Sequence, residues 1–129
     1  MPAPKRKRIL IVEDTVSGQM LIKRWIINAG YDTEIASDGN QALTMAKANA
    51  PDLILLDVVM PELNGYAVCR KLRDIEETKK TPILITTGLH SSSDADDAKL
   101  SGANEVIVKP VEREALIKKI QQYLGAGLA

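Results

Sequence analysis

The sequence predicts an α/β fold built on a mostly parallel sheet of five strands. Short, largely apolar segments alternate with longer segments that carry apolar residues at helical spacing, and this alternation repeats from about residue 9 to residue 124 of the 129-residue chain. Most of the short segments are continuously apolar, which is typical of strands buried on both faces of a parallel sheet. The length and the 45% hydrophobic content fit one globular domain with a substantial core.

The first half of the chain contains two predicted strands and two predicted helices. Residues 9–12 form a β-branched run that ends at two acids, and residues 33–36 form a short second strand. Between them, apolar side chains at helical spacing predict a helix over 16–28, which an Ala-Gly pair ends. After the second strand, Asp38 predicts the N-cap of a helix that continues through Ala46.

The second half contains three more strands, and a helix follows each of them. The predicted strands are residues 53–56, 82–87 and 105–108, and the predicted helices begin at about Asn64, Ser91 and Glu112. The last helix is expected to run to Leu124 with its apolar residues on one face. We expect right-handed connections between the parallel strands.

Charge, cysteine content and the lengths of the apolar runs limit the classes of partner and compartment. Equal numbers of basic and acidic residues, 17 each, argue against direct nucleic-acid binding, and the basic run at residues 5–8 is interpreted as a solvated flank. The single cysteine, Cys69, lies on an apolar helix face and is predicted to be a small core residue. No run is long enough for a targeting signal or a membrane span, so we expect a cytoplasmic protein without a membrane partner.

Four predicted strands end in groups that carry charge or donate hydrogen bonds. These groups are Glu13 and Asp14, then Asp57, then Thr86, Thr87 and Gly88, and finally Lys109 and Pro110. A parallel sheet gathers such strand ends at one edge. At about 4 Å and an effective dielectric near 20, each pair of like charges costs on the order of 4 kcal/mol. Lys109 relieves part of this repulsion, and a hard divalent cation such as Mg²⁺ is the natural supplement.

Four motifs carry a resemblance to a known family. They are Ile-Leu-Ile-Val-Glu-Asp at 9–14, Asp-Leu-Ile-Leu-Leu-Asp-Val-Val-Met-Pro-Glu-Leu-Asn-Gly at 52–65, Pro-Ile-Leu-Ile-Thr-Thr-Gly at 82–88 and Gly-Ala-Asn-Glu-Val-Ile-Val-Lys-Pro at 102–110. With these motifs in order, the chain resembles response-regulator receiver domains over about residues 8–124, and stand-alone chemotaxis-type regulators in size. Residues 1–7 then form an N-terminal flank. Residues 125–129 form a C-terminal tail that we expect to fray or to begin a linker.

The resemblance implies both a fold and a function. The fold is a flavodoxin-like (βα)5 three-layer sandwich whose parallel five-stranded sheet has the order 2-1-3-4-5. The function is that of a switch in a two-component phosphorelay, in which a histidine kinase or a histidine phosphotransfer protein donates a phosphoryl group to Asp57. Such a chain is not an enzyme beyond Mg²⁺-dependent self-phosphorylation and slow autodephosphorylation.

The resemblance also implies the metal ligands. Mg²⁺, or Mn²⁺ in its place, would be held directly by Asp14, Asp57 and the backbone carbonyl of Val59. Glu13 would act through a bound water, because it is one methylene longer than the aspartate that many relatives carry.

The resemblance also implies roles in switching for further residues. Thr87 and Lys109 would contact phosphoryl oxygens, and Gly88 beside Thr87 would modulate the switch. The Lys109–Pro110 peptide is expected to be cis, and Gly65 is expected to permit a turn or a close backbone approach. The fourth helix, fifth strand and fifth helix would bind an unidentified downstream protein.

Three positions depart from the family pattern. Val106 stands three residues before the lysine, where many receivers carry a Tyr or Phe whose ring moves with the switch threonine. We therefore hypothesise that Thr87 and the 88–92 loop carry the signal. Val59 and Leu89 border the expected phosphoryl position and are apolar, so they cannot orient an attacking water, which predicts a long-lived aspartyl phosphate.

Two other classes of protein and one other role for a histidine fit the sequence less well than a stand-alone receiver does, whereas one alternative stays open. An aspartyl-nucleophile phosphatase needs a second acid two residues after the nucleophile, where this chain has Val59. A flavin-binding domain would need a Ser/Thr/Gly-rich phosphate loop after the first strand. His90 is interpreted as a solvated loop residue rather than a phosphodonor. A receiver excised from a longer regulator with a DNA-binding or enzymatic output domain remains open.

Overall fold

The computed structural model describes residues 5–60, 64–88 and 92–128, and it contains a five-stranded parallel sheet in the order β2-β1-β3-β4-β5. The strands are β1 (Arg8–Val12), β2 (Asp32–Ala36), β3 (Leu53–Asp57), β4 (Ile83–Thr87) and β5 (Glu105–Val108). The helices are α1 (Val16–Asn28), α2 (Gly39–Ala48), α3 (Gly65–Asp74), α4 (Ser92–Ser101) and α5 (Arg113–Leu124). The predicted flavodoxin-like fold and strand order are confirmed, with boundaries that differ from the prediction by one or two residues.

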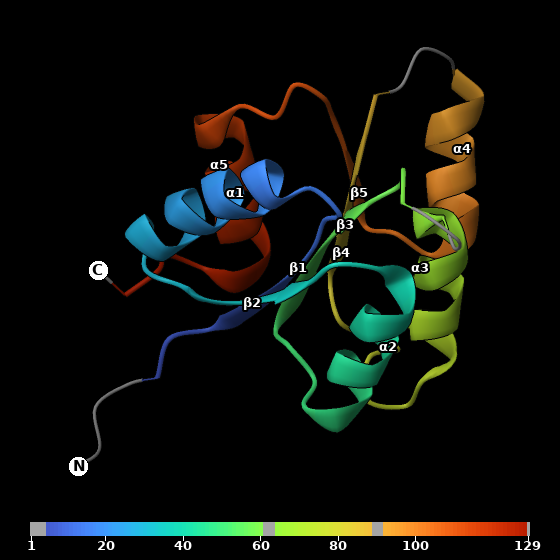
Figure 1. Cartoon of the computed structure of the whole chain (residues 1–129), viewed down its shortest axis with the longest axis horizontal. Helices are drawn as coiled ribbons and strands as arrows, with labels where there is room; N and C mark the ends of the chain where they lie inside the picture. Colours follow the sequence, from blue (N-terminus) through green and yellow to red (C-terminus); the bar gives the residue numbers. More distant parts are fainter. Residues whose placement is uncertain (1–4, 61–63, 89–91, 129) are drawn as a thin grey trace.

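Helices cover both faces of the sheet, so the molecule has three layers. Helices α1 and α5 lie on one face, and α2, α3 and α4 lie on the other (Figure 1). Alternate strand residues point to opposite faces: in β1, Ile9 and Ile11 pack toward α1 and α5, whereas Leu10 and Val12 pack toward the other three helices. Burial on both faces explains why the strand sequences are continuously apolar.

Side-chain caps begin three of the helices just after a strand has ended. The side chains of Thr15, Asp38 and Asn64 each accept a hydrogen bond from the backbone N–H three residues later, at the starts of α1, α2 and α3. The predicted cap at Asp38 is therefore confirmed. These caps fix the turns at the carboxyl edge of the sheet, where β1 and β3 deliver the acidic residues.

The C-terminal tail corrects one expectation. We expected residues 125–129 to fray, but the Leu128 N–H donates to the Gly30 carbonyl at 2.9 Å, and the Tyr31 hydroxyl donates to the Gly125 carbonyl. The backbones approach closely because both sides of the contact carry glycine. A Cβ on Gly30 would lie 2.4 Å from the Leu128 nitrogen, and a Cβ on Gly127 would lie 2.0 Å from the Ala29 carbonyl oxygen.

Two further predictions concern burial. Cys69 is a free, fully buried thiol on α3, which confirms its assignment to the core. Across the described part of the chain, no helix combines the length and the apolar character that crossing a membrane requires.

Candidate functional site

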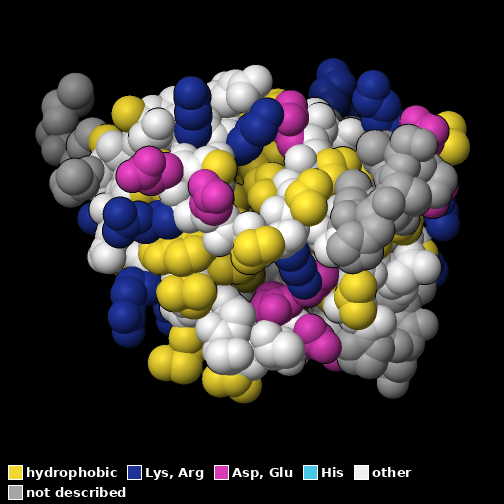
Figure 2. All heavy atoms as spheres, turned by 90° about the horizontal axis from the view of Figure 1, so that it is seen from above, with side chains coloured by type: hydrophobic (Ala, Val, Ile, Leu, Met, Phe, Trp, Pro, Cys, Tyr) yellow, Lys and Arg dark blue, Asp and Glu magenta, His cyan; other side chains and the backbone are white. Residues whose placement is uncertain are grey.

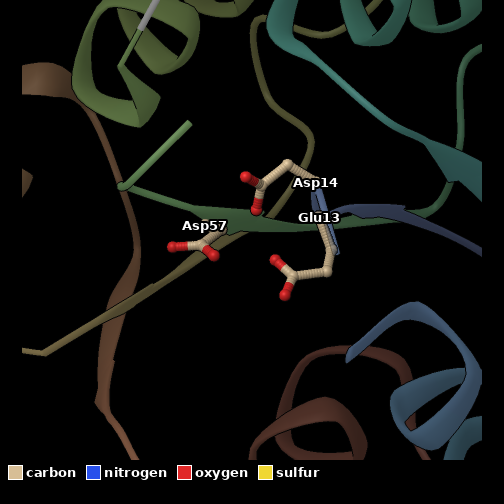
Figure 3. A group of neighbouring side chains, drawn as sticks. All are labelled: Glu13, Asp14 and Asp57. Carbon is tan, nitrogen blue, oxygen red and sulfur yellow. The ribbon is translucent and has the colours of Figure 1, made fainter. Parts of the chain in front are cut away.

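Three carboxylates meet at the carboxyl edge of the sheet. Glu13 and Asp14 follow β1 directly, and Asp57 is the last residue of β3, which pairs with β1. One carboxylate oxygen from each residue lies within 4.8 Å of the other two (Figure 3). Strand β1 is also the point where the chain order reverses, with β2 on one side and β3 on the other, and ligands of open α/β sheets bind at such a point.

Asp57 is held in a defined orientation by two donors. Its side chain is buried, with 4% of the residue exposed. The Val59 N–H donates to Asp57 Oδ1 at 3.0 Å, and Lys109 Nζ lies 2.8 Å from Asp57 Oδ2. The Lys109 side chain is 37% exposed. The carboxylate of Asp57 is therefore held in a buried position, whereas the Lys109 side chain that contacts it is partly exposed to solvent.

The pKa of Glu13 reflects its burial and the negative charge beside it. Partial burial, a hydrogen bond with Asp57 and the charge of Asp57 raise the pKa of Glu13 to about 7, whereas Thr15 and Lys109 act in the opposite direction. Burial is the largest of these causes, and the contribution of Asp57 shows that neighbouring negative charge adds to it despite the ammonium of Lys109. An oxygen-rich cluster of this kind fits a hard divalent cation, so the residues present match the expected Mg²⁺.

The backbone that carries Asp57 is packed directly against the start of α3. A Cβ on Gly65 would lie 2.5 Å from the Asp57 carbonyl oxygen and 2.7 Å from the Val58 Cα. The Gly65 N–H also donates to the Val58 carbonyl at 3.0 Å. The predicted close approach at Gly65 is therefore confirmed.

Thr87 and Lys109 come from neighbouring strand ends on the other side of Asp57. Thr87 ends β4 with 4% of the residue exposed, and the Lys109 N–H donates to the Thr87 carbonyl at 2.8 Å. The Lys109–Pro110 peptide is cis, as predicted. Among the described residues, an added Cβ on Gly88 would meet no atom within 4 Å.

The residues that depart from the family pattern occupy different environments. Val59 is 67% exposed at the mouth of the site. Val106 is half-buried in β5 and packs against the core on the α2–α3–α4 side of the sheet. Leu89 and His90 lie outside the described residues.

The structure adds residues that the sequence analysis did not select. The Thr15 hydroxyl donates to Glu13 Oε1 at 2.8 Å, and Gln19 Nε2 donates to the Glu13 carbonyl at 2.6 Å. A threonine just before an apolar periodic segment is an N-cap signal, so Thr15 could have been found by that rule. Gln19 has no such local signal, because its contact depends on how α1 folds back over Glu13.

The face that contains this site is charged at its centre. Figure 2 views the molecule from the carboxyl edge of the sheet and shows acidic side chains gathered around a basic one, with hydrophobic side chains alongside. The doubly wound fold and the acidic pocket at its carboxyl edge together define a receiver-type signalling domain.

Known proteins share these features. The model of the response regulator receiver domain matches residues 9–121. The response regulator PleD of Caulobacter vibrioides is 36% identical over 114 residues, covering 88% of this chain and 25% of PleD. The polar-differentiation response regulator DivK of Brucella ovis is 34% identical over 119 residues, covering 92% of this chain and 97% of DivK.

A solved structure shows the same architecture. The receiver domain of the sensor histidine kinase PA1611 from Pseudomonas aeruginosa has a magnesium ion coordinated in its active-site cleft. It superposes with a TM-score of 0.86 at 30% identity, covering 94% of this chain and 99% of that domain. The chain belongs to the response regulator receiver domain family.

Proposed function

We propose that this chain is a phosphorylation switch of a two-component system, in which Asp57 accepts a phosphoryl group from a phosphohistidine. The donor is a histidine kinase or a histidine phosphotransfer protein, and the chain acts beside it in the cytoplasm. The observation that carries the proposal is the buried Asp57 carboxylate, which the Val59 N–H and Lys109 orient within 4.8 Å of two further carboxylates. Phosphoryl transfer depends on this kind of positioning and charge balance.

The transfer forms one bond and breaks another. A carboxylate oxygen of Asp57 attacks phosphorus in line, and the P–N bond to the donor imidazole breaks, leaving its electron pair on the nitrogen. Lys109, already 2.8 Å from Asp57 Oδ2, would then pair with a phosphoryl oxygen. The Thr87 hydroxyl would donate to another, because Thr87 ends the strand next to Asp57.

A bound Mg²⁺, or Mn²⁺, would neutralise charge on the transferred group. Asp14, Asp57 and the Val59 carbonyl would hold it, and Glu13 would act through a water. Asp14 is exposed whereas Asp57 is buried, so the cation would sit between solvent and the acceptor. The proximity of three carboxylates supports this assignment, since a dication would offset their mutual repulsion.

The signal would leave through the face formed by α4, β5 and α5. Phosphorylation adds charge beside Lys109 and would draw Thr87 and Lys109 toward it, shifting a two-state surface that binds an unidentified downstream protein. A groove of about 360 Å³ lies on this face, lined by Val106, Ile107, Val108, Pro110, Glu112, Ala115 and Lys119. With valine rather than an aromatic at position 106, the movement of Thr87 and the 88–92 loop would carry the signal. Val59 and Leu89 would shield the phosphoryl group and slow its hydrolysis.

The test is phosphorylation of the purified chain by acetyl phosphate with Mg²⁺, followed by intact-mass measurement. We expect one added phosphoryl group on the unaltered chain and none on Asp57→Asn. Asp74→Asn, an exposed aspartate at the end of α3, is the matched control and should behave like the unaltered chain. Equal labelling of Asp57→Asn, or labelling that persists without a divalent cation, would overturn the proposal.

The partial coverage of PleD favours a second candidate. Because the chain spans 25% of PleD, the same switch could be the receiver part of a longer regulator with a DNA-binding or enzymatic output domain. The length of the complete gene distinguishes this candidate from a stand-alone regulator such as DivK, which the chain covers almost fully.

A further inference from the structure

Helix α1 has a glycine in its first turn, where helix formation does not favour one. Gly18 is the third residue of α1, and glycine is less favourable within a helix than any residue except proline. The conformation of the backbone does not explain it, because Gly18 is not among the glycines with positive φ. Its N–H donates to the Thr15 hydroxyl oxygen at 3.2 Å, a bond that any residue other than proline could make.

The space that a side chain would occupy at Gly18 is filled by Glu13. A Cβ on Gly18 would lie 2.3 Å from Glu13 Oε1, 3.0 Å from Glu13 Cδ and 2.7 Å from Thr15 Oγ1. Real Cβ atoms essentially never come that close to another heavy atom. An alanine at position 18 would therefore require the carboxylate of Glu13, the hydroxyl of Thr15 or both to move.

The carboxylate of Glu13 is anchored in this space. The Thr15 hydroxyl donates to its Oε1 at 2.8 Å, and Gln19 Nε2 holds the Glu13 carbonyl at 2.6 Å. Thr15 and Gln19 belong to the N-cap and first turns of α1, so the start of the helix fixes both ends of the Glu13 residue. From this position Glu13 still has a carboxylate oxygen within 4.8 Å of those of Asp14 and Asp57.

We infer that Gly18 is a positioning residue for the cation site, because it leaves room for the long side chain of Glu13 against helix α1. Glu13 extends one methylene further than an aspartate, and the missing Cβ of Gly18 is what accommodates the extra length. A side chain at position 18 would displace the Glu13 carboxylate, the Thr15 hydroxyl or both, and would so disturb the arrangement of Glu13 relative to Asp14 and Asp57. This inference rests on the proposed binding of Mg²⁺ at these carboxylates.

The experiment is a double-mutant cycle read by equilibrium binding of Mg²⁺ alone, measured by calorimetry. We expect Gly18→Ala to weaken Mg²⁺ binding about tenfold, the lower end of the range for groups that orient metal ligands. In a Glu13→Asp background the shorter carboxylate leaves the space beside position 18, and Thr15 Oγ1 is the close neighbour that remains. There Gly18→Ala should change the affinity by less than about twofold, the limit for independent sites.

A second measurement and a matched variant separate positioning from helix stability. Ser17→Ala also replaces a weaker helix former in the first turn of α1, but Ser17 is exposed, so this variant should leave the Mg²⁺ affinity unchanged. In the metal-free protein, Gly18→Ala should raise Tm by at most about 2–4 °C in the Glu13→Asp background, where only the Thr15 hydroxyl has to shift for the new methyl group. It should raise Tm less in the unaltered background, where the new methyl group displaces Glu13.

Two outcomes would overturn the inference while leaving the proposed function intact. One is an unchanged Mg²⁺ affinity in Gly18→Ala. The other is an equal loss of affinity in both backgrounds, since Gly18 would then not act through Glu13. By contrast, an unaltered chain that binds no Mg²⁺ and accepts no phosphoryl group would overturn the proposed function, and this inference would fall with it.

Discussion

The two edges of the sheet balance charge in opposite ways. At the carboxyl edge, three carboxylates lie within 4.8 Å of one another and meet the ammonium of Lys109. At the amino edge, the guanidinium of Arg73 donates to five acceptors without a carboxylate among them. Those acceptors are the carbonyls of Thr78, Lys79, Thr81 and Gly102 and the side-chain oxygen of Asn104.

The amino edge is closed by side chains that tie one strand start to another. Asn104 Oδ1 accepts from the Ile83 N–H and from Arg73, both at 2.8 Å, and so links the segments before β4 and β5. Asp52 Oδ2 accepts from the Arg8 N–H at 2.7 Å and links the start of β1 to the segment before β3. These side chains therefore find their partners within the described part of the chain.

The difference shows which edge can respond to a ligand. The groups named at the amino edge have partners inside the chain, so we expect this edge to contribute mainly to stability. At the carboxyl edge, burial raises the pKa of Glu13, and the hydrogen bond and charge of Asp57 raise it further, so we expect the free energy of this edge to depend on a bound cation and on the charge of a phosphoryl group. This contrast makes three predictions, from the largest expected effect to the smallest.

Removing Arg73 should cause the largest loss of stability. Arg73→Met keeps much of the apolar stem but leaves partly buried carbonyl oxygens without a donor, and we expect a loss of about 2–4 kcal/mol in the free energy of unfolding. Denaturation by urea measures it. Arg70→Met, an exposed position on the same helix, is the control and should change stability by less than about 0.5 kcal/mol. A loss for Arg73→Met as small as that of the control would contradict the assigned role of this edge.

The sequence predicted the carboxyl edge better than the amino edge, for a physical reason. Strand ends in a parallel sheet share an edge, so finding the strands was enough to bring Asp14, Asp57 and Lys109 together. The contacts of Arg73 join side chains and carbonyls up to 31 residues apart, and no local pattern marks them. The tail contact at Gly30 is equally non-local, because it depends on where α5 ends relative to α1.

Within the site, too, the contacts that orient a side chain could not be predicted from local sequence patterns. The direction of the Glu13 side chain depends on the fold of α1 around Thr15 and Gly18, which a list of strand-end residues does not contain. Sequence patterns therefore indicated which carboxylates meet, but not how helix α1 holds one of them.

Adding Mg²⁺ should stabilise the protein through the carboxyl edge. At a free concentration of ten times Kd, binding to the native state alone contributes about 1.4 kcal/mol. We expect this gain in urea denaturation at matched ionic strength, and we expect Asp14→Asn to abolish most of it. Arg73→Met should retain the full gain, because its defect lies at the other edge. If Mg²⁺ stabilised Asp14→Asn as much as the unaltered chain, the cation would be acting elsewhere.

The smallest expected effect tests whether the amino edge also responds to pH. Glu105 begins β5 and contacts Lys119 Nζ at 2.8 Å and the Tyr123 hydroxyl at 2.7 Å. The hydrogen bond from Lys119, followed by that from Tyr123, lowers the pKa of Glu105, and burial together with the bond to Glu105 raises the pKa of Tyr123 to about 12. A pKa lower in the folded than in the unfolded state stabilises the protein above the unfolded pKa, and this stabilisation is lost as the pH falls through the folded pKa.

Glu105→Gln should therefore lower the free energy of unfolding by at most about 1 kcal/mol at neutral pH, as for other partly exposed ion pairs. The difference between the variant and the unaltered chain should shrink as the pH falls through the lowered pKa of Glu105, where the carboxylate gains its proton. Urea denaturation across a series of neutral to acidic pH values measures it, and added salt should reduce the neutral-pH difference by screening. A difference that instead grew in acid would mean that Glu105 is stabilised in its protonated form. The amino edge would then contain a carboxylate whose charge is not balanced by its partners, as at the carboxyl edge, and the proposed difference between the two edges would not hold at Glu105.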